Sequence, residues 1–86
     1  MIYVYAIKST TFNRIYVGMS EDVENRLAEH NSGKTQSTRF YGPWTLFYHE
    51  PFEARLEARK REIYLKSGSG KEFLREVWVM HENKVS

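Results

Sequence analysis

The sequence predicts a small α/β domain: a three-stranded antiparallel sheet packed with helices, in the order β-β-α-β-α-α. Two observations favour this fold class. With 86 residues, of which 41% are hydrophobic and 15% aromatic, the chain has the size and composition of one folded domain, residues 1–86. Its apolar residues alternate in the first segment and later recur at helical spacing, which favours helices packed on a sheet.

The first two predicted strands form a hairpin. The segments "IYVYAIKS" (2–9) and "RIYVGM" (14–19) are rich in β-branched and aromatic residues, as strands are. Only "TTFN" separates them, and so short a connection favours antiparallel pairing. A third strand, "WTLFYHE" (44–50), is predicted between Pro43 and Pro51.

The first predicted helix follows the second strand directly. Ser20 is a suitable N-cap, and Glu21 and Asp22 suit the positive end of the helix dipole. We expect the helix to end near Asn31, because Gly33 just beyond it is a common stop signal.

Two further helices follow the third strand. The segment from 53 to 66, "EARLEARKREIYLK", predicts a helix that the following "SGSG" stops. The segment from 71 to 83, "KEFLREVWVMHEN", predicts a last helix with Phe73, Val77 and Met80 at helical spacing. No internal repeat or low-complexity tract interrupts this order.

The composition excludes several kinds of site and location. The chain contains no cysteine, so it has neither disulfides nor thiolate metal sites, which fits a reducing, cytoplasmic location. No apolar run approaches the roughly 20 residues that span a bilayer, so we expect no membrane partner. The N-terminal segment alternates and lacks a basic leader, so it predicts a strand and not a signal peptide.

The charge is small overall but unevenly distributed. The net charge is +2, yet residues 55–75 carry seven basic side chains against three acidic ones. Residues 21–29 instead carry four acidic side chains. One basic flank is compatible with a polyanionic partner, although many solvated helices look similar.

One face of the first helix carries polar groups where apolar packing is expected. At about 100° per residue, four side chains fall on a single arc: Val23, Arg26, Leu27 and His30. A cation and an imidazole turned toward the packed side of a helix usually meet a partner there. Arg26 and His30 are therefore candidate functional residues, and their i,i+4 spacing lets them converge on one point.

The order of these motifs resembles the GIY-YIG nuclease family. "YVY" (3–5) stands where the family has GIY, without its glycine, and "YVG" (16–18) stands where it has YIG. Arg26 follows ten residues after Tyr16, and Glu62 lies on a later helix. Each short motif is unspecific alone, whereas the ordered set is specific.

The resemblance extends over about residues 2–75. The segments "SEDVENRLAEHNSGK" (20–34) and "EARKREIYLKSGSGKEFL" (57–74) are similar to the small, stand-alone branch of the family. That branch is akin to the nuclease module of the UvrC repair protein. The resemblance implies the same fold that the periodicity predicts, a GIY-YIG-like α/β domain.

The resemblance also implies a function. It indicates a metal-dependent endonuclease that hydrolyses nucleic-acid phosphodiester bonds in repair or recombination, with DNA as the expected partner and one divalent cation, Mg²⁺ or Mn²⁺, as cofactor. Substrate choice would come from the domain itself, from a homo-oligomer or from a separate targeting partner. Two alternatives stay open: a non-catalytic nucleic-acid-binding module of the same fold, and a protein-interaction adaptor that uses its basic helix.

The same resemblance assigns roles to the strand tyrosines and the first helix. It implies that Tyr16 is the general base or a water-positioning phenol and that Tyr5 lies beside it. Arg26 would hold the phosphate, which suits a planar, permanently charged side chain, and His30 would hydrogen-bond Tyr16 or relay its proton. The alternatives are tyrosines that only pack and a histidine satisfied by the helix C-terminus.

Glu62 is the metal ligand that the resemblance implies. On its helix it shares an arc with Ala54, Ala58 and Leu65. The two alanines are small and let the helix approach the sheet closely. One carboxylate completed by water and phosphate oxygens is a usual way of binding Mg²⁺. The alternative is an i,i+4 salt bridge from Glu62 to Lys66.

Basic and hydroxyl side chains supply the candidate contacts to nucleic acid. The stretch "NSGKTQSTRFYGP" (31–43) predicts a loop, and loops of this length are often functional, although plain solubility would also explain it. This loop and the 53–66 helix offer side chains that suit phosphate contacts: Lys34, Thr38, Arg39, Arg55, Arg59 and Lys66. His49 and His81 show no spacing for a zinc site and receive no role.

Overall fold

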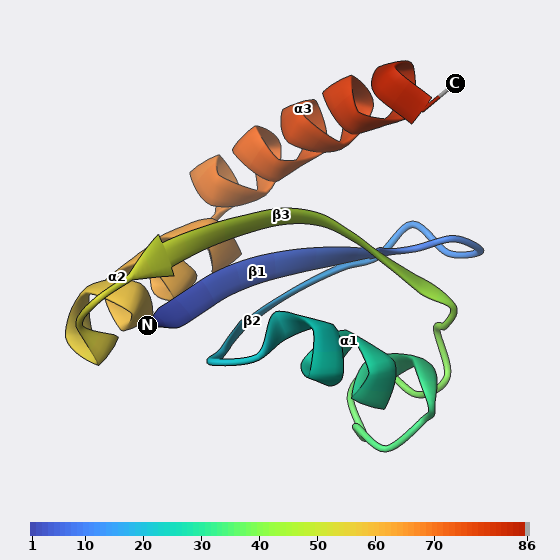
Figure 1. Cartoon of the computed structure of the whole chain (residues 1–86). Helices are drawn as coiled ribbons and strands as arrows, with labels where there is room; N and C mark the ends of the chain where they lie inside the picture. Colours follow the sequence, from blue (N-terminus) through green and yellow to red (C-terminus); the bar gives the residue numbers. More distant parts are fainter. Residues whose placement is uncertain (86) are drawn as a thin grey trace.

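The computed structural model describes residues 1–85 and confirms the predicted α/β fold. Its elements are β1 (Ile2–Ser9), β2 (Ile15–Ser20), α1 (Val23–Asn31), β3 (Trp44–Phe52), α2 (Arg55–Lys66) and α3 (Gly68–Val85). Figure 1 shows the sheet between two helical layers, with α1 on one face and α2 and α3 on the other. Within residues 1–85, every helix is too short or too polar to span a membrane.

The central strand of the sheet is β1, and both of its neighbours run antiparallel to it, in the order β2-β1-β3. The β1–β2 register places Tyr5 opposite Gly18, so Tyr5 and Tyr16 are diagonal neighbours on one face. β3 continues to Phe52, beyond the predicted strand end. β2 therefore forms one edge of the sheet, and Tyr16 lies on that edge.

The alternation along β1 divides the interior into two clusters. On the face covered by α2 and α3, an apolar cluster forms around Val4, Ala6 and Leu65. On the face covered by α1, a second cluster contains Tyr5 and Ile7. Successive strand residues point to opposite faces, so the sequence pattern itself dictates this division.

Two helix starts differ from the sequence expectation. The predicted Ser20 N-cap is wrong: α1 is capped by Asp22, whose carboxylate accepts a hydrogen bond from the Asn25 backbone N–H at 3.1 Å. Ser20 ends β2, and its hydroxyl accepts from the Asp22 backbone N–H at 3.0 Å, which shapes the turn into the helix. α2 begins at Arg55, after the expected start at Glu53.

Only one residue of the "SGSG" segment separates the last two helices, and the rest of the segment is helical. α2 ends at Lys66, and α3 already begins at Gly68, earlier than predicted. Ser67 interrupts the helices with an extended backbone, at φ −76° and ψ 170°. A side chain on Gly70 would clash with the Tyr64 carbonyl oxygen, so this glycine permits the close approach of α3 to α2.

The packed face of α3 also differs from the predicted one. Phe73 and Val77 are partly buried, as expected, whereas Met80 is 61% exposed. Trp78 contacts the sheet instead, with its ring 5.3 Å from that of Phe47 on β3. The helix therefore turns an aromatic side chain, which helical spacing alone did not single out, toward the strand.

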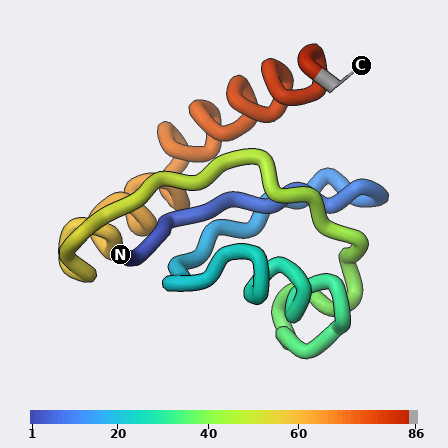
Figure 2. The backbone as a smooth tube through the Cα atoms, viewed as in Figure 1, coloured from blue at the N-terminus to red at the C-terminus, as the bar shows by residue number. Residues whose placement is uncertain are grey.

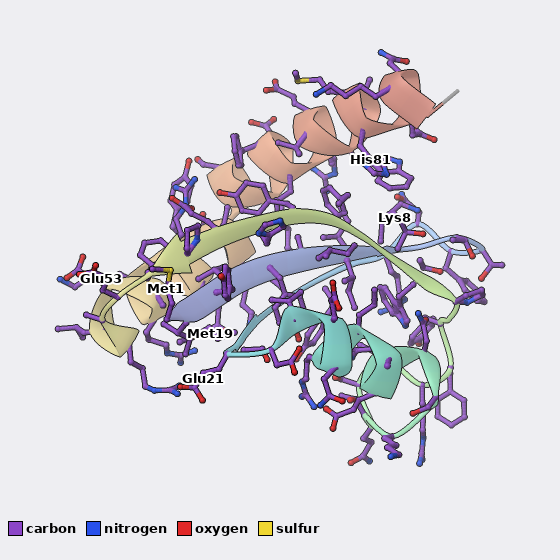
Figure 3. The ribbon with its side chains drawn as sticks, in the orientation of Figure 1. Met1, Lys8, Met19, Glu21, Glu53 and His81 are labelled. Atoms are coloured by element: carbon purple, nitrogen blue, oxygen red, sulfur yellow. The ribbon has the colours of Figure 1, made fainter. Side chains whose placement is uncertain are left out.

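The C-terminal half of α3 is joined to the sheet by stacked side chains. The rings of Trp78 and His81 stack with centroids 5.3 Å apart, and the Lys8 ammonium lies 5.5 Å from the Trp78 ring. Figure 3 shows Lys8 and His81 on the facing sides of β1 and α3. His81 thus takes part in packing.

Candidate functional site

Three aromatic rings from two strands and a helix meet on the α1 face of the sheet. Tyr5 and His30 are each 1% exposed, and the Tyr5 hydroxyl lies 2.8 Å from His30 Nε2 in a hydrogen bond. The Tyr16 ring packs beside them, with its centroid 4.9 Å from that of His30 and 6.4 Å from that of Tyr5. The structure therefore brings the three residues together, but it gives His30 a hydrogen bond to Tyr5 where we expected Tyr16.

Gly18 makes room for this arrangement. It lies opposite Tyr5, and a side chain at this position would come within 2.6 Å of the Tyr5 hydroxyl oxygen. The same side chain would approach the Tyr16 ring at 3.1 Å. The glycine of the "YVG" motif is thus required by the tyrosine of the neighbouring strand.

Thr38, in the loop between α1 and β3, closes the buried end of the cluster. Its side chain is fully buried, and its hydroxyl lies 2.8 Å from His30 Nδ1. Figure 2 shows this loop curling beside α1 before the chain enters β3. The Trp44 indole N–H donates to the Thr38 carbonyl at 3.0 Å and holds the loop there. We expected Thr38 to contact phosphate from the surface, and its burial against His30 corrects that expectation.

Asn31 ties the end of α1 to the start of β3. Its amide oxygen accepts from the Trp44 backbone N–H at 2.6 Å, and its amide nitrogen donates to the Trp44 carbonyl at 3.1 Å. Sequence reasoning treated Asn31 only as a helix end. The contact fixes both ends of the loop that carries Thr38.

Burial sets the protonation states in the cluster. It raises the pKa of Tyr5 to about 12, with a further rise from Tyr16 and an opposing effect of Arg26. Burial, together with the nearby Arg26 charge, lowers the pKa of His30 below its usual value. At neutral pH the Tyr5 phenol therefore keeps its proton, and His30 is neutral.

Arg26 borders this cluster on α1. Its helix neighbours Val23 and Leu27 pack against the second cluster, which contains Tyr5, as the predicted arc requires. Its guanidinium forms an ion pair with Glu29 at 2.9 Å, and its side chain is 37% exposed. The Glu29 carboxylate raises the pKa of Arg26, burial opposes this, and the Tyr5 hydroxyl adds to the rise. Arg26 is therefore a permanent, partly exposed cation beside Tyr5.

Glu62 acts on the same region from the other helical layer. It lies on α2, which packs on β1 and β2, and its side chain is 9% exposed. Its carboxylate pairs with Arg59 and, at 3.1 Å, with Lys66. Its negative charge also raises the pKa of Tyr5, although less than burial does. The Lys66 salt bridge, which the sequence offered as the alternative to a metal ligand, is thus formed, and the carboxylate is close enough to Tyr5 to influence its pKa.

A metal ion at this site would have few protein ligands. Within residues 1–85, no group of three or more His, Cys, Asp or Glu side chains could hold one. Glu62 alone would bind the ion together with water and substrate oxygens, a donor set that suits Mg²⁺. The side chains of Arg59 and Lys66 are 58% and 50% exposed, so both can leave the carboxylate and remain hydrated. The residues present fit one hard cation of this kind.

The remaining predicted contacts to nucleic acid fall into two groups. Lys34 and Arg39 are exposed on the loop after α1, and Arg55 is exposed at the start of α2. Arg59 and Lys66 are gathered around Glu62 instead. The structure thus leaves the first three side chains on the surface and brings the other two to the candidate metal ligand.

A cavity beside Tyr16 contains cations to which sequence reasoning gave no role. It has a volume of about 390 Å³ and lies between the β1–β2 hairpin, the loop before β3 and α3. Arg14, Lys71 and Arg75 line it, together with Tyr41. In the sequence, Lys71 and Arg75 count only as part of a basic flank, because spacing along one helix cannot tell which strand it faces.

Comparison with known proteins decides the family. The model of the GIY-YIG catalytic domain matches residues 1–75. The chain belongs to the GIY-YIG family. GIY-YIG domains are nuclease domains, so the match confirms the resemblance that the ordered motifs carry.

Small GIY-YIG proteins match most of the chain. It is 38% identical over 74 residues to the UPF0213 protein SH2523 from Staphylococcus haemolyticus, covering 85% of this chain and 89% of that protein. It is 40% identical over 67 residues to the UPF0213 protein CPE1444 from Clostridium perfringens, covering 77% and 71%. The solution NMR structure of the UPF0213 protein BH0048 from Bacillus halodurans matches 90% of this chain and 85% of its own, with 33% identity and a TM-score of 0.53. The chain is thus similar to small, stand-alone GIY-YIG proteins.

Proposed function

We propose that this chain is a metal-dependent endonuclease that hydrolyses phosphodiester bonds of DNA. The observation that supports this best is the buried Tyr5–His30 hydrogen bond, packed against Tyr16 and beside the Arg26 guanidinium. A buried hydrogen-bonded pair stabilises a fold little more than apolar groups of the same shape would. Its presence in so small a core therefore favours a chemical role. The likeness of the motifs to the UvrC nuclease module supports repair or recombination as the setting.

The two tyrosines suit different tasks. The Tyr5 hydroxyl is buried and bonded to His30, whereas Tyr16 is partly exposed and its hydroxyl forms no hydrogen bond within residues 1–85. Tyr16 therefore suits direct contact with the attacking water, as general base or as a positioning group. Tyr5 and His30 would hold its ring in place.

Arg26 suits the phosphate that is attacked. Its guanidinium is permanently charged and partly exposed, and it can exchange the Glu29 carboxylate for two phosphate oxygens. A fixed cation at this position would stabilise the charge that builds up on the phosphate in the transition state.

Glu62 would hold the divalent cation, Mg²⁺ or Mn²⁺. When bound, such an ion neutralises charge on the phosphate and favours ionised water. Arg59 and Lys66 keep the buried carboxylate paired when no ion is bound, which avoids an isolated charge in the interior.

The test is cleavage of labelled linear, nicked, flapped and branched DNA, and of RNA, by the full chain with Mg²⁺, Mn²⁺ or EDTA. We expect cleavage only with metal. We expect none from Glu62→Gln, whose DNA binding stays equal or becomes tighter because a negative charge is removed.

Glu57→Gln is the matched control. Glu57 lies on the same helix and pairs with Lys60, but its side chain is 59% exposed. The Glu57→Gln variant should therefore cleave DNA at the wild-type rate. Wild-type cleavage by Glu62→Gln, or cleavage in EDTA, would contradict the proposal.

A non-catalytic nucleic-acid-binding module is the second candidate. The two ion pairs of Glu62 favour it, because a carboxylate held by two cations also has a purely structural explanation. Tight binding without cleavage of any substrate, with either metal, would support this candidate over the first.

A further inference from the structure

Three cations from two separate parts of the chain line the cavity beside Tyr16. Arg14 comes from the end of the β1–β2 hairpin, and Lys71 and Arg75 lie one turn apart on α3. None of the three forms an ion pair with a carboxylate within residues 1–85, in contrast to Arg26 and Arg59. The positive charge of the cavity is therefore not neutralised by the protein itself, which favours an anionic ligand.

The guanidinium of Arg14 is held in a defined orientation. It lies over the Tyr41 ring at 3.9 Å from the centroid, a cation–π contact. The Phe12 ring packs edge-on against the same tyrosine at 5.3 Å, and the Ser9 hydroxyl donates to the Tyr41 carbonyl at 2.6 Å. A guanidinium fixed in this way offers its planar face to a nucleobase at a small entropic cost.

We propose that this cavity binds one nucleotide of the strand that flanks the cleaved bond, with its phosphates on Lys71 and Arg75 and its base against the Arg14 guanidinium. The proposal rests on the proposed nuclease function. Tyr16 is part of the cavity wall, so a strand lying there passes directly from the cavity to the reacting tyrosine. A volume of about 390 Å³ lies in the range of pockets that hold small ligands, about 300–1,000 Å³.

The test measures binding of labelled single-stranded and duplex oligonucleotides in EDTA, over a range of salt concentrations. The variants are Lys71→Gln with Arg75→Gln, and Arg14→Gln alone. The control is Lys60→Gln with Lys84→Gln, which removes the same charge from exposed positions outside the cavity. Each lost phosphate contact lowers the slope of log K against log salt by about 0.7 on single strands and about 0.9 on duplex.

We expect the cavity pair to lower this slope by about 1.4 to 1.8 and to weaken binding at least 10-fold, while the control pair changes neither by half as much. Equal losses for the two pairs, or no binding by the wild type, would overturn the proposal. Inorganic phosphate and a mononucleotide are tested as competitors. Displacement of the oligonucleotide by either one at micromolar concentration would also overturn it, because the cavity would then hold a free phosphate compound.

The outcomes separate this proposal from the proposed function. Loss of binding by the cavity pair in a chain that cleaves nothing supports the cavity and contradicts the nuclease. If the Lys71→Gln, Arg75→Gln variant cleaves DNA and binds it as well as the control variant does, the result supports the nuclease function and contradicts the cavity proposal.

A second inference concerns Thr38 and rests on a separate observation, the direction of the buried hydrogen bonds. The Thr38 hydroxyl lies 3.4 Å from the Thr35 carbonyl oxygen, which can only accept, so the hydroxyl donates to it. The same hydroxyl oxygen is then left to accept from His30 Nδ1 at 2.8 Å. With its proton on Nδ1, His30 accepts the Tyr5 hydroxyl proton at Nε2.

We infer that Thr38 is a positioning residue that fixes the tautomer of His30 and thereby the direction of the Tyr5 proton. Tyr5, His30 and Thr38 are all almost fully buried, so water does not compete for these bonds. In this tautomer the neutral imidazole can take a proton from Tyr5 and cannot give one to it.

The test is long-range ¹H–¹⁵N NMR of the His30 ring in the wild type, in Thr38→Val and in Thr38→Ser. We expect a protonated Nδ1 in the wild type and in Thr38→Ser, which keeps the hydroxyl. In Thr38→Val, which keeps the shape but lacks the hydroxyl, the Nε2-protonated form should become detectable.

Two results would overturn this inference. One is a wild-type His30 protonated at Nε2. The other is a ring signal in Thr38→Val identical to that of the wild type. If Thr38→Val does not fold, the wild type and Thr38→Ser still decide, because both must show the proton on Nδ1.

Discussion

The two faces of the sheet are packed with different chemistry. The face under α2 and α3 buries aliphatic side chains such as Val4, Ala6 and Leu65. The face under α1 buries a phenol, an imidazole and a hydroxyl in one chain of hydrogen bonds. Within residues 1–85, no buried side-chain nitrogen or oxygen lacks a hydrogen-bond partner, so the polar face is fully satisfied.

The aliphatic cluster mainly stabilises the fold, whereas the polar cluster supplies the groups for chemistry. An aliphatic cluster gains stability in proportion to the apolar surface that it buries. A polar cluster whose hydrogen bonds are all formed adds little further stability, but it fixes the directions of its hydrogen bonds and the protonation states of its side chains. The β1 strand supplies both, because its alternate residues belong to opposite clusters. We therefore expect substitutions within the aliphatic cluster and within the polar cluster to change different measured quantities.

Within the polar cluster, the largest effect on activity is expected for Tyr16→Phe. Positioned acid–base groups contribute about 10²–10⁴-fold, so the cleavage rate should fall by that factor while the ring still packs and the melting temperature stays nearly constant. Tyr64→Phe, on the exposed side of α2, makes the same change outside the site and should have no effect. A wild-type rate for Tyr16→Phe in single-turnover assays would show that this phenol only packs.

Leu65→Ala tests the aliphatic cluster on the opposite face of the sheet. Leu65 is fully buried in the aliphatic cluster, and truncation of such a side chain costs about 2–5 kcal/mol. We expect that loss in the free energy of unfolding by urea, with the cleavage rate of the folded fraction unchanged. Leu56→Ala on the same helix starts from a side chain that is 65% exposed and should cost less than about 0.5 kcal/mol. Equal losses for the two variants would be inconsistent with this packing.

Gly18→Ala probes the point where a strand and the polar cluster meet. The added methyl would lie 2.6 Å from the Tyr5 hydroxyl, so the tyrosine must shift. A displacement of about 1 Å near a reacting group can cost about 10²-fold in rate. In Gly68→Ala, the control, the methyl meets nothing within 4 Å, and cleavage should be unaffected. Identical rates for the two variants would mean that Tyr5 needs no fixed position.

The smallest effect is the pH dependence of stability from His30. Its pKa is lowered in the folded chain, whereas in the unfolded chain it protonates near pH 6.5. Below that pH the unfolded chain binds more protons, so stability falls by up to about 1.4 kcal/mol per pH unit as the pH decreases. Urea titrations of the wild type and His30→Gln from pH 8 to 5 should show this extra slope in the wild type alone. Parallel curves would indicate a His30 that titrates normally.

The order of elements was predictable because each has a strong period. The alternation along residues 2–9 assigns side chains to two faces, and the structure confirms this in both clusters. The arc that joins Arg26 and His30 to Val23 and Leu27 was also predictable, since helical geometry fixes it. Helix starts were less so, because Ser20 and Asp22 are both good caps and only the turn geometry selects one.

The partners inside the site were not predictable from spacing. His30 bonds to Tyr5, 25 residues away, and the choice between two tyrosines depends on the strand register and on the space over Gly18. Thr38 lies in a loop without periodicity, so nothing in the sequence showed that its side chain is buried. Likewise, the cation cavity unites a hairpin with a helix that lies far along the chain.

The most direct test of the central assignment, that the polar face under α1 is the site of phosphodiester cleavage, is a crystal structure of Glu62→Gln with a bound oligonucleotide. We predict a phosphodiester in contact with the Arg26 guanidinium, Glu29 released from it, and the Tyr16 hydroxyl within hydrogen-bond distance of the phosphate or its water. A strand bound elsewhere, with the 2.9 Å Arg26–Glu29 pair intact and Tyr16 remote from any phosphate, would contradict the assignment.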